Sequence, residues 1–384
     1  MKGNKKRKVL IVGCLPPPFE GTAKMIEVVY TSKYLNAEYS INMLSLKKRK
    51  YATKRGALSI VNMSLNIVNI VKYIKKLVMF NPEIVYSTLA QNRYGFLRDS
   101  LFILVGAMFG KKICVHFYGG NYDMFYKQQN VMFKGYIKYV LNKLDMLILQ
   151  AEKFKEQFDE LVDRKKMLTI FSCLPIDING IENTGKRNSN DVVKVLFMGY
   201  LSKAKGALSV AEAIPLVLEK YSDAIEFILC GQPVDIERNI TFIPDPDYGY
   251  TKIVRIINEN KLDNIVKIYT AYTNEEKDVL LSQSDIFVFP TYSEGCGLVV
   301  LEAMYYGLPV ITTEVGALGE MLKEKDNCLF VTPGDYRDIA DKIVSLAENV
   351  QKRKEMGMNN YKLVRMEYNT EAFCQQISKA WSSI

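Results

Sequence analysis

Strand-like and helix-like stretches alternate along the whole chain, and this alternation constrains the fold more than any other feature. Short runs of Val, Ile, Leu and Phe recur between longer stretches with helical apolar patterns. Such alternation favours parallel sheets covered by helices. Residues 179–191 interrupt it with a polar, glycine-bearing stretch that indicates a linker. At 384 residues the chain is too long for one core, so the sequence predicts two doubly wound α/β domains.

The expected elements follow from the apolar patterns. In the first half, strands are expected at 8–13, 41–44, 84–87, 113–117, 146–149 and 168–171, and helices at 22–36, 57–80, 94–109, 130–143 and 151–162. In the second half, strands are expected at 193–199, 225–231, 265–270, 285–289, 309–312 and 328–331. The final stretch, 358–384, spaces Phe373, Ile377 and Trp381 as on one buried face of a helix.

The pattern of cysteines and the short lengths of the apolar stretches favour a reduced, cytoplasmic protein. The seven cysteines are scattered and never form C-x-x-C, so neither a disulfide framework nor a metal site is expected. The basic N-terminus runs through a short strand into three prolines, unlike a signal peptide. No apolar stretch approaches the roughly 20 residues of a membrane-spanning helix, and 100–109 comes nearest.

Charge is divided unevenly between the two halves. Residues 1–190 hold 31 Lys/Arg and 14 Asp/Glu, whereas residues 191–384 hold 20 and 28. A basic half favours an anionic partner. The densest run, Lys47-Lys48-Arg49-Lys50, precedes the long helical pattern at 57–80, and together they suggest contact with an anionic membrane surface or an acceptor. Packing of that helix against its own sheet is the competing interpretation, and no nucleic-acid motif interleaves aromatic residues with the lysines.

Residues 284–313 carry the strongest chemical signal. An apolar strand runs into Glu294-Gly295-Cys296-Gly297, which opens a helix, and Glu302 follows two helical turns later. Unpaired N–H groups at a helix N-terminus attract anions, and glycine lets a phosphate come close. A carboxylate beside such a site would repel phosphate but suits sugar hydroxyls. A buried turn with two solvated glutamates is the alternative.

The segment E-G-C-G-L-V-V-L-E-A-M-x-x-G-L-P-V-I-T-T resembles the E-x7-E segment of retaining glycosyltransferases of family 4, the glycosyl transferases group 1 with the GT-B fold. The resemblance continues through Gly316 and Glu320 and residues 333–335. It implies that Glu294 contacts the donor hexose and Glu302 the ribose. The backbone amides of Gly295, Cys296, Gly297, Leu298 and Val299 would hold the diphosphate. Cys296 stands where the family usually has an aromatic residue.

A second segment, V-K-V-L-F-M-G-Y-L-S-K-A-K-G at 193–206, is similar to the family's G-R-L-x-x-x-K-G. Gly199 ends the strand, and Lys205 takes the lysine position. Ammonium groups beside a helix N-terminus would neutralise a diphosphate leaving group. Tyr200 replaces the family's arginine, which removes one cation for which Lys203 could partly compensate.

Two features of the first half of the chain also resemble features of the family. His116, the only histidine, ends an apolar strand before a double glycine. A lone histidine at such a place is more often a core residue, but its position resembles that of a histidine beside the reacting sugar. It would bond the donor hexose or support the backbone that does. Gly21 and Thr22 resemble a glycine-bearing loop that approaches the diphosphate.

The resemblance implies two Rossmann-like domains facing a cleft. Residues 1–185, completed by a returning helix at about 362–384, would bind the acceptor, and residues 191–361 would bind the donor. The implied activity is retaining, metal-independent transfer of a hexose from a UDP- or GDP-linked donor, without another cofactor. The implied acceptor is a lipid-linked saccharide in capsule, O-antigen or exopolysaccharide synthesis, at the inner face of the plasma membrane.

Other functions fit the residues less well. The first strand lacks G-x-G-x-x-G, which disfavours a dinucleotide-dependent oxidoreductase. Asp245-Pro-Asp247 is formally a D-x-D metal motif, but its turn-like surroundings favour a surface loop. Epimerase and phosphorylase activities stay open because a fold does not fix a reaction. A non-catalytic subunit is disfavoured by the presence of Glu294, Lys205 and His116 together.

Overall fold

The computed structural model describes residues 6–17, 21–46, 60–175, 192–221, 224–235 and 248–384. The chain forms two compact units. Unit 1 contains Met1–Ile176 and Asn369–Ile384, and unit 2 contains Asp177–Tyr368. The expected domain limits, 1–185 with 362–384 and 191–361, differ from these by several residues. No helix in the described ranges combines the length and the apolar character needed to cross a bilayer.

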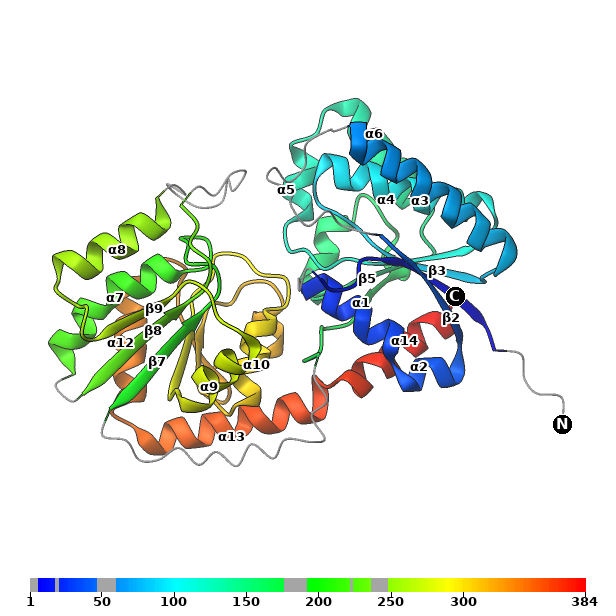
Figure 1. Ribbon diagram of the computed structural model, residues 1–384. Helices are drawn as coiled ribbons and strands as arrows, with labels where there is room; N and C mark the ends of the chain where they lie inside the picture. Colours follow the sequence, from blue (N-terminus) through cyan, green and yellow to red (C-terminus); the bar gives the residue numbers. More distant parts are fainter. Residues whose placement is uncertain (1–5, 18–20, 47–59, 176–191, 222–223, 236–247) are drawn as a thin grey trace. The chain divides into compact units, whose positions relative to one another are not determined.

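Unit 1 is built on a parallel sheet with strand order β2-β1-β3-β4-β5-β6. Helices α1, α2 and α14 cover one face, and α3, α4 and α6 cover the other (Figure 1). The strands are β1 (Lys8–Gly13), β2 (Ser40–Ser45), β3 (Ile84–Thr88), β4 (Lys112–His116), β5 (Met146–Leu149) and β6 (Met167–Thr169). The helices are α1 (Gly21–Thr31), α2 (Lys33–Glu38), α3 (Ile60–Met79), α4 (Arg93–Met108), α5 (Tyr122–Lys127), α6 (Val131–Leu141) and α14 (Thr370–Ser382), with 3₁₀ turns at Glu152–Phe158 and Arg164–Lys166.

Unit 2 repeats this plan with strand order β12-β11-β10-β7-β8-β9, again parallel. The strands are β7 (Val193–Met198), β8 (Ile225–Cys230), β9 (Val266–Tyr269), β10 (Ile286–Phe289), β11 (Val310–Thr312) and β12 (Cys328–Phe330). The helices are α7 (Ala207–Lys220), α8 (Gly249–Glu259), α9 (Asn274–Gln283), α10 (Leu298–Tyr305), α11 (Leu318–Met321), α12 (Tyr336–Ala347) and α13 (Val350–Glu367). All four residues of β10 are buried, as a strand covered on both faces requires.

The predicted fold class, two doubly wound parallel α/β units, is confirmed. Two helical predictions were wrong in detail. The stretch 22–36 is two helices, because the Ser32 hydroxyl accepts from the Leu35 N–H (3.2 Å) and starts α2. Residues 151–162 contain a 3₁₀ turn instead of an α-helix, and the short helix α5 was not predicted.

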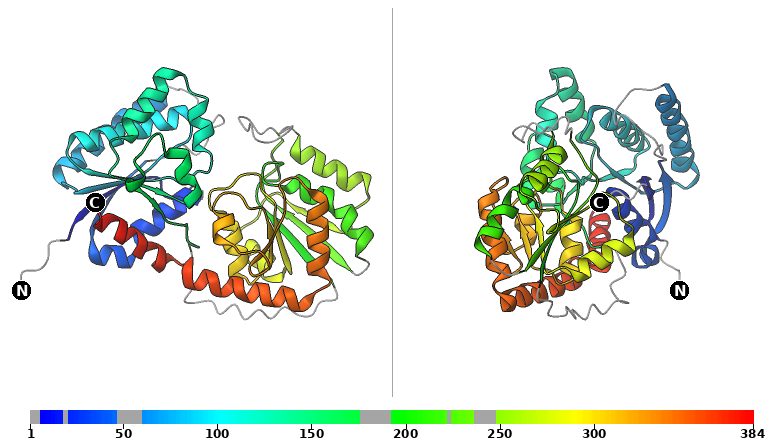
Figure 2. Two further views of the ribbon diagram at one scale, coloured as in Figure 1. Left: turned by 180° about the vertical axis from the view of Figure 1, so that it is seen from behind. Right: turned by 60° about the vertical axis from the view of Figure 1, so that its left-hand side comes forward.

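The last helix, α14, packs on unit 1, where it lies beside α2 (Figure 2). Phe373, Ile377 and Trp381 are all buried, as their spacing predicted. The Trp381 ring meets those of Tyr39 and Tyr86 edge-on, at centroid distances of 5.2 and 5.4 Å. The returning segment therefore belongs to the core of unit 1, although it begins at 369 and not at 362.

Candidate functional site

The site of unit 2 lies where the strand order reverses. From β7 the chain moves outward through β8 and β9, whereas β10, which neighbours β7 on its other side, leads outward through β11 and β12. Loops leaving the carboxyl ends of β7 and β10 therefore part in opposite directions. Such a switch point leaves a crevice in which doubly wound sheets bind ligands.

The loop after β7 is held directly against the loop after β10. The Tyr292 N–H donates to the Ala204 carbonyl (2.9 Å). Gly206 has a φ of +82° and precedes α7, and a Cβ atom there would lie 2.2 Å from the Pro290 carbonyl oxygen. Only glycine allows this left-handed conformation and this close approach without strain. The sequence G-Y-L-S-K-A-K-G thus positions Lys205 beside β10.

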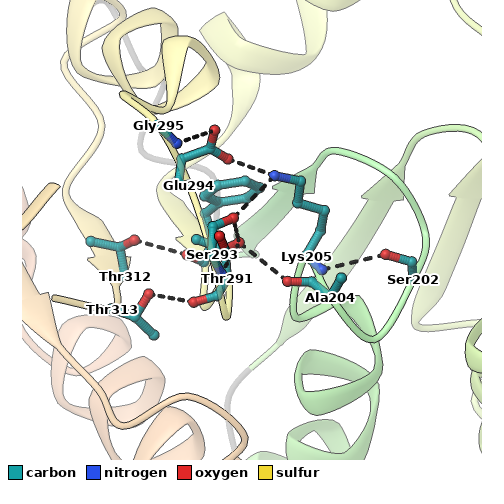
Figure 3. A network of polar contacts seen from close by, with 10 residues as sticks. Ser202, Ala204, Lys205, Thr291, Ser293, Glu294, Gly295, Thr312 and Thr313 are labelled. Carbon is teal, nitrogen blue, oxygen red and sulfur yellow. Dashed lines mark hydrogen bonds and ion pairs between the residues drawn. The ribbon is translucent and has the colours of Figure 1, made fainter. Parts of the chain in front are cut away.

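Threonines from the neighbouring strand fix the loop after β10 (Figure 3). Thr312 donates its hydroxyl to the Phe289 carbonyl (2.8 Å), and Thr313 donates to that of Thr291 (2.6 Å). A Cβ atom on Gly316, which has a φ of +56°, would lie 1.9 Å from the Glu294 carbonyl oxygen. Glu294 is therefore placed by buried hydrogen bonds and by close backbone packing.

Lys205 and Glu294 form an ion pair at this junction. The Lys205 Nζ donates to Glu294 Oε2 at 2.8 Å and to the Ser293 carbonyl at 3.3 Å, while the Gly295 N–H donates to Glu294 Oε1 at 3.1 Å (Figure 3). The side chains are 25% and 20% exposed. The structure thus brings together two of the three residues predicted to be catalytic. Both keep enough exposure to meet a ligand.

The helix that follows Glu294 begins as the sequence predicted. Gly297 has a φ of +71° and caps α10, so the N–H groups of Leu298 and Val299 lie in the first turn, where the helix offers no acceptor. Cys296 is buried, with its Sγ atom 3.4 Å from the Met321 Sδ atom. Its side chain therefore faces the core.

Glu302 has a basic partner that sequence reasoning missed. Lys277, from α9, donates from Nζ to Glu302 Oε1 at 2.8 Å, and the two side chains are only 15% and 14% exposed. The capping box of Thr273 and Glu276 signals the start of α9 in the sequence. No local signal in the sequence shows that Lys277, the residue after this box, contacts Glu302.

The residues that precede Lys205 sit around the same loop. Gly199 follows β7 with a φ of +157°, and a Cβ there would lie 3.0 Å from the Phe289 ring. Tyr200, the residue in place of an arginine, is 44% exposed. Lys203 is half-buried and lies near Glu212 of α7. Burial raises the pKa of Glu212, and the positive charges of Lys203 and Lys252 oppose that rise.

His116 lies in the core of unit 1. It is fully buried, stacked on Tyr118 at a centroid distance of 4.1 Å, and its Nδ1 atom lies 2.8 Å from the Tyr86 hydroxyl. The Phe373 ring of α14 stacks 6.1 Å away. Burial lowers the pKa of His116 to about 3. This placement suits support of the strand end, whereas a direct bond to a sugar would require the ring to become exposed.

Of the remaining predicted residues, Gly21 and Thr22 lie within the described ranges. Gly21 is the exposed first residue of α1, and Thr22 follows it, half-buried. Both belong to a helix start and not to a loop. The basic run 47–50 and the D-x-D segment 245–247 lie outside the described residues. Elsewhere in the described ranges no three His, Cys, Asp or Glu side chains gather as metal ligands would.

Comparison with known proteins gives both sequence and structural matches. Over 224 residues the chain is 27% identical to an uncharacterized glycosyltransferase of Methanocaldococcus jannaschii, covering 58% of this chain and 56% of the relative. It is 22% identical to the capsular polysaccharide biosynthesis glycosyltransferase CapM of Staphylococcus aureus, covering 65% and 66%. The chain thus spans less than two thirds of the length of these relatives. The structure of Anabaena HepE in complex with UDP has a TM-score of 0.69 at 15% identity, covering 98% and 100%.

The two doubly wound units, with a lysine and two glutamates at the switch point of the second, define a protein of the GT-B class. Residues 182–363 match the model of the family described as glycosyl transferases group 1. The matched residues lie within unit 2.

Proposed function

We propose that the protein is a retaining glycosyltransferase that moves a hexose from a nucleotide-diphosphate sugar to a saccharide hydroxyl. The observation that carries the proposal is the Lys205–Glu294 pair, held 2.8 Å apart at the switch point beside the N-terminus of α10. A cation, a carboxylate and helix N–H groups together suit a ligand that joins a diphosphate to a polyol. The match of residues 182–363 to the group 1 glycosyl transferase model and the UDP in the HepE structure support this donor class.

Each group has a distinct role in the proposed reaction. The N–H groups of Leu298 and Val299 and the ammonium of Lys205 neutralise the diphosphate as the bond between sugar C1 and phosphate oxygen breaks. Glu294 accepts from hexose hydroxyls, and Glu302 accepts from the ribose. The acceptor oxygen bonds to C1 on the face that the diphosphate leaves, and the hydroxyl proton departs with the diphosphate. Lys205 and the N-terminus of α10 thus stabilise the departing diphosphate, a role that a metal ion has in other enzymes.

We infer from the Lys205–Glu294 pair how donor binding would change the site. The Lys205 ammonium donates to the Glu294 carboxylate and to the Ser293 carbonyl. A diphosphate would compete for the same ammonium, which would free Glu294 Oε2 to accept from a sugar hydroxyl. Binding of the phosphate and recognition of the hexose are therefore coupled through one lysine.

We further propose that the acceptor is a lipid-linked saccharide of a cell-surface polysaccharide, and that transfer occurs at the inner face of the plasma membrane. The relation to CapM supports a role in capsule-like synthesis. The excess of basic residues in the first half, 31 Lys/Arg against 14 Asp/Glu over residues 1–190, suits an acceptor that carries lipid phosphate.

Thermal unfolding with UDP-, GDP-, ADP- and dTDP-sugars tests the donor site. A donor at about 100 times its dissociation constant stabilises the folded state by about 2.7 kcal/mol, which raises the Tm by roughly 5–10 °C for a unit of this size. The rise should occur with one base, vanish in Glu302→Ala and persist in Glu355→Ala, a matched change on the exposed surface of α13. No rise with any donor, or an equal rise in Glu302→Ala, would refute the proposal.

A further inference from the structure

Three helices of unit 1 expose an unusual amount of apolar surface. More than half of the large apolar side chains that the described residues expose lie on α3, α4 and α6. We call this surface the helical patch. Its members are Ile67, Val68, Val71, Ile74, Val78 and Met79 of α3, Tyr94, Leu97, Leu101 and Met108 of α4, and Val131, Met132 and Tyr139 of α6.

The exposed residues of α3 form a stripe distinct from the buried face of the helix. Tyr73 and Leu77 point into unit 1 and are buried. Ile67, Val71 and Val78, spaced at four and seven residues, lie on one line of the helix surface, and their exposures are 66%, 61% and 62%. The helix is therefore apolar on two faces, of which its own sheet covers one.

The three helices that carry the patch pack side by side on one face of the sheet (Figures 1 and 2). The Tyr73 ring of α3 meets the Phe102 ring of α4 edge-on at 5.2 Å. Between α4 and α6, the Ser100 and Tyr136 hydroxyls lie 2.7 Å apart. Met132, Val131 and Met108 are the most exposed members, at 87%, 84% and 83%. Apolar patches of this extent on a folded protein mark interaction surfaces.

The charged residues of these helices are almost all basic. Lys72 and Lys75 of α3 and Lys138 of α6 are exposed. The single carboxylate within the three helices is Asp99, which is buried and paired with Arg98 at 2.7 Å. The helical patch thus presents apolar side chains and ammonium groups without an exposed acidic group.

We propose that the helical patch docks on the surface of an anionic phospholipid bilayer. Apolar side chains between lysines suit a headgroup region, where the side chains enter the acyl boundary and the ammonium groups meet lipid phosphates. A second copy of the chain fits less well, because a two-fold contact would place lysines against lysines. The biological use of this docking rests on the proposed function, since it would hold the enzyme where lipid-linked acceptors lie.

Co-sedimentation with vesicles tests the docking of the whole protein. Vesicles of phosphatidylcholine with 30% phosphatidylglycerol should bind the protein, and pure phosphatidylcholine should bind it weakly. Replacing Lys72 and Lys75 with glutamine should lower the partition coefficient by about fivefold per lysine at low salt. The double variant Met108→Ser/Met132→Ser should lower it by about tenfold or more, because it removes two of the three most exposed apolar side chains.

The matched control is Met358→Ser/Met366→Ser, which changes two exposed methionines of α13 in unit 2 and should leave vesicle binding unchanged. Absence of binding by the wild type, or an equal loss in this control, would overturn the proposal. A concentration-dependent dimer that Met108→Ser/Met132→Ser abolishes would also overturn it and assign the patch to self-association. Donor-induced stabilisation, measured without vesicles, separates failure of the transferase proposal from failure of the docking proposal.

Discussion

The single histidine makes one prediction unusually easy to isolate. His116 is fully buried among Tyr86, Tyr118 and Phe373, and burial lowers its pKa from 6.5 to about 3. Between those two values the unfolded chain binds a proton on this residue and the folded chain does not. Stability therefore rises with pH across this window and falls as pH is lowered below about 6.5.

The magnitude follows from these two pKa values. Lowering the pH from 7 to 5 protonates nearly all unfolded chains at His116 but few folded ones, which costs about 2 kcal/mol of unfolding free energy. Urea unfolding at the two pH values measures this loss for the wild type. His116→Asn keeps a polar side chain but does not titrate, so its loss over the same interval should be smaller by about 2 kcal/mol.

Proton NMR of the imidazole gives the matching direct measurement. Because the chain has one histidine, the Hε1 resonance needs no assignment by mutation. It should show no titration step between pH 5 and pH 8. A midpoint near 6.5 would refute the reasoning, since it would show an imidazole open to water. An equal pH dependence in His116→Asn would refute it independently.

Two further predictions concern the frame of the site. Lys277→Met should lower the unfolding free energy by about 1–2 kcal/mol, a value between those of surface and buried ion pairs, because it removes Lys277 from a Glu302 side chain that is only 14% exposed. In a double-mutant cycle measured by urea unfolding, the variant Lys277→Met/Glu302→Gln should regain most of this free energy. Strict additivity of the two substitutions would contradict the pairing. Gly206→Ala should cost more than about 2 kcal/mol, since its Cβ would meet the Pro290 carbonyl at a φ of +82°. Its control, Gly135→Ala in α6, has open space around the new methyl group and should stabilise by about 0.5–1 kcal/mol, so equal effects would contradict the packing argument.

The fold could be predicted from the sequence because buried parallel strands need continuous apolar runs. Residues 286–289 read as a strand by composition alone, and β10 occupies them. Helix limits were harder, because a single side chain can set them. Ser32 ends one helix and caps the next, although the apolar pattern continues through it.

The candidate site could be predicted in part. Lys205 stands next to Gly206, and Glu294 lies three residues before Gly297. Both glycines have the positive φ angles that these loops require, so the local sequence carries the signal for both sites. Lys277 carries no such signal, because its contact with Glu302 arises only when α9 packs beside α10. The residues of α3 that face outward could not be predicted either. Periodicity shows that a helix has two apolar faces, but not which of them the sheet covers.

The central claim is that a nucleotide sugar binds at the switch point of unit 2. Hydrogen-exchange mass spectrometry of the whole chain, with and without the donor that raises the Tm, locates that site directly. Exchange should slow in peptides covering residues 199–206 and 293–302, where Lys205, Glu294 and the first turn of α10 lie. The same donor should slow these peptides less in Lys205→Met. Protection confined to other parts of the chain, with these peptides unchanged, would contradict the account.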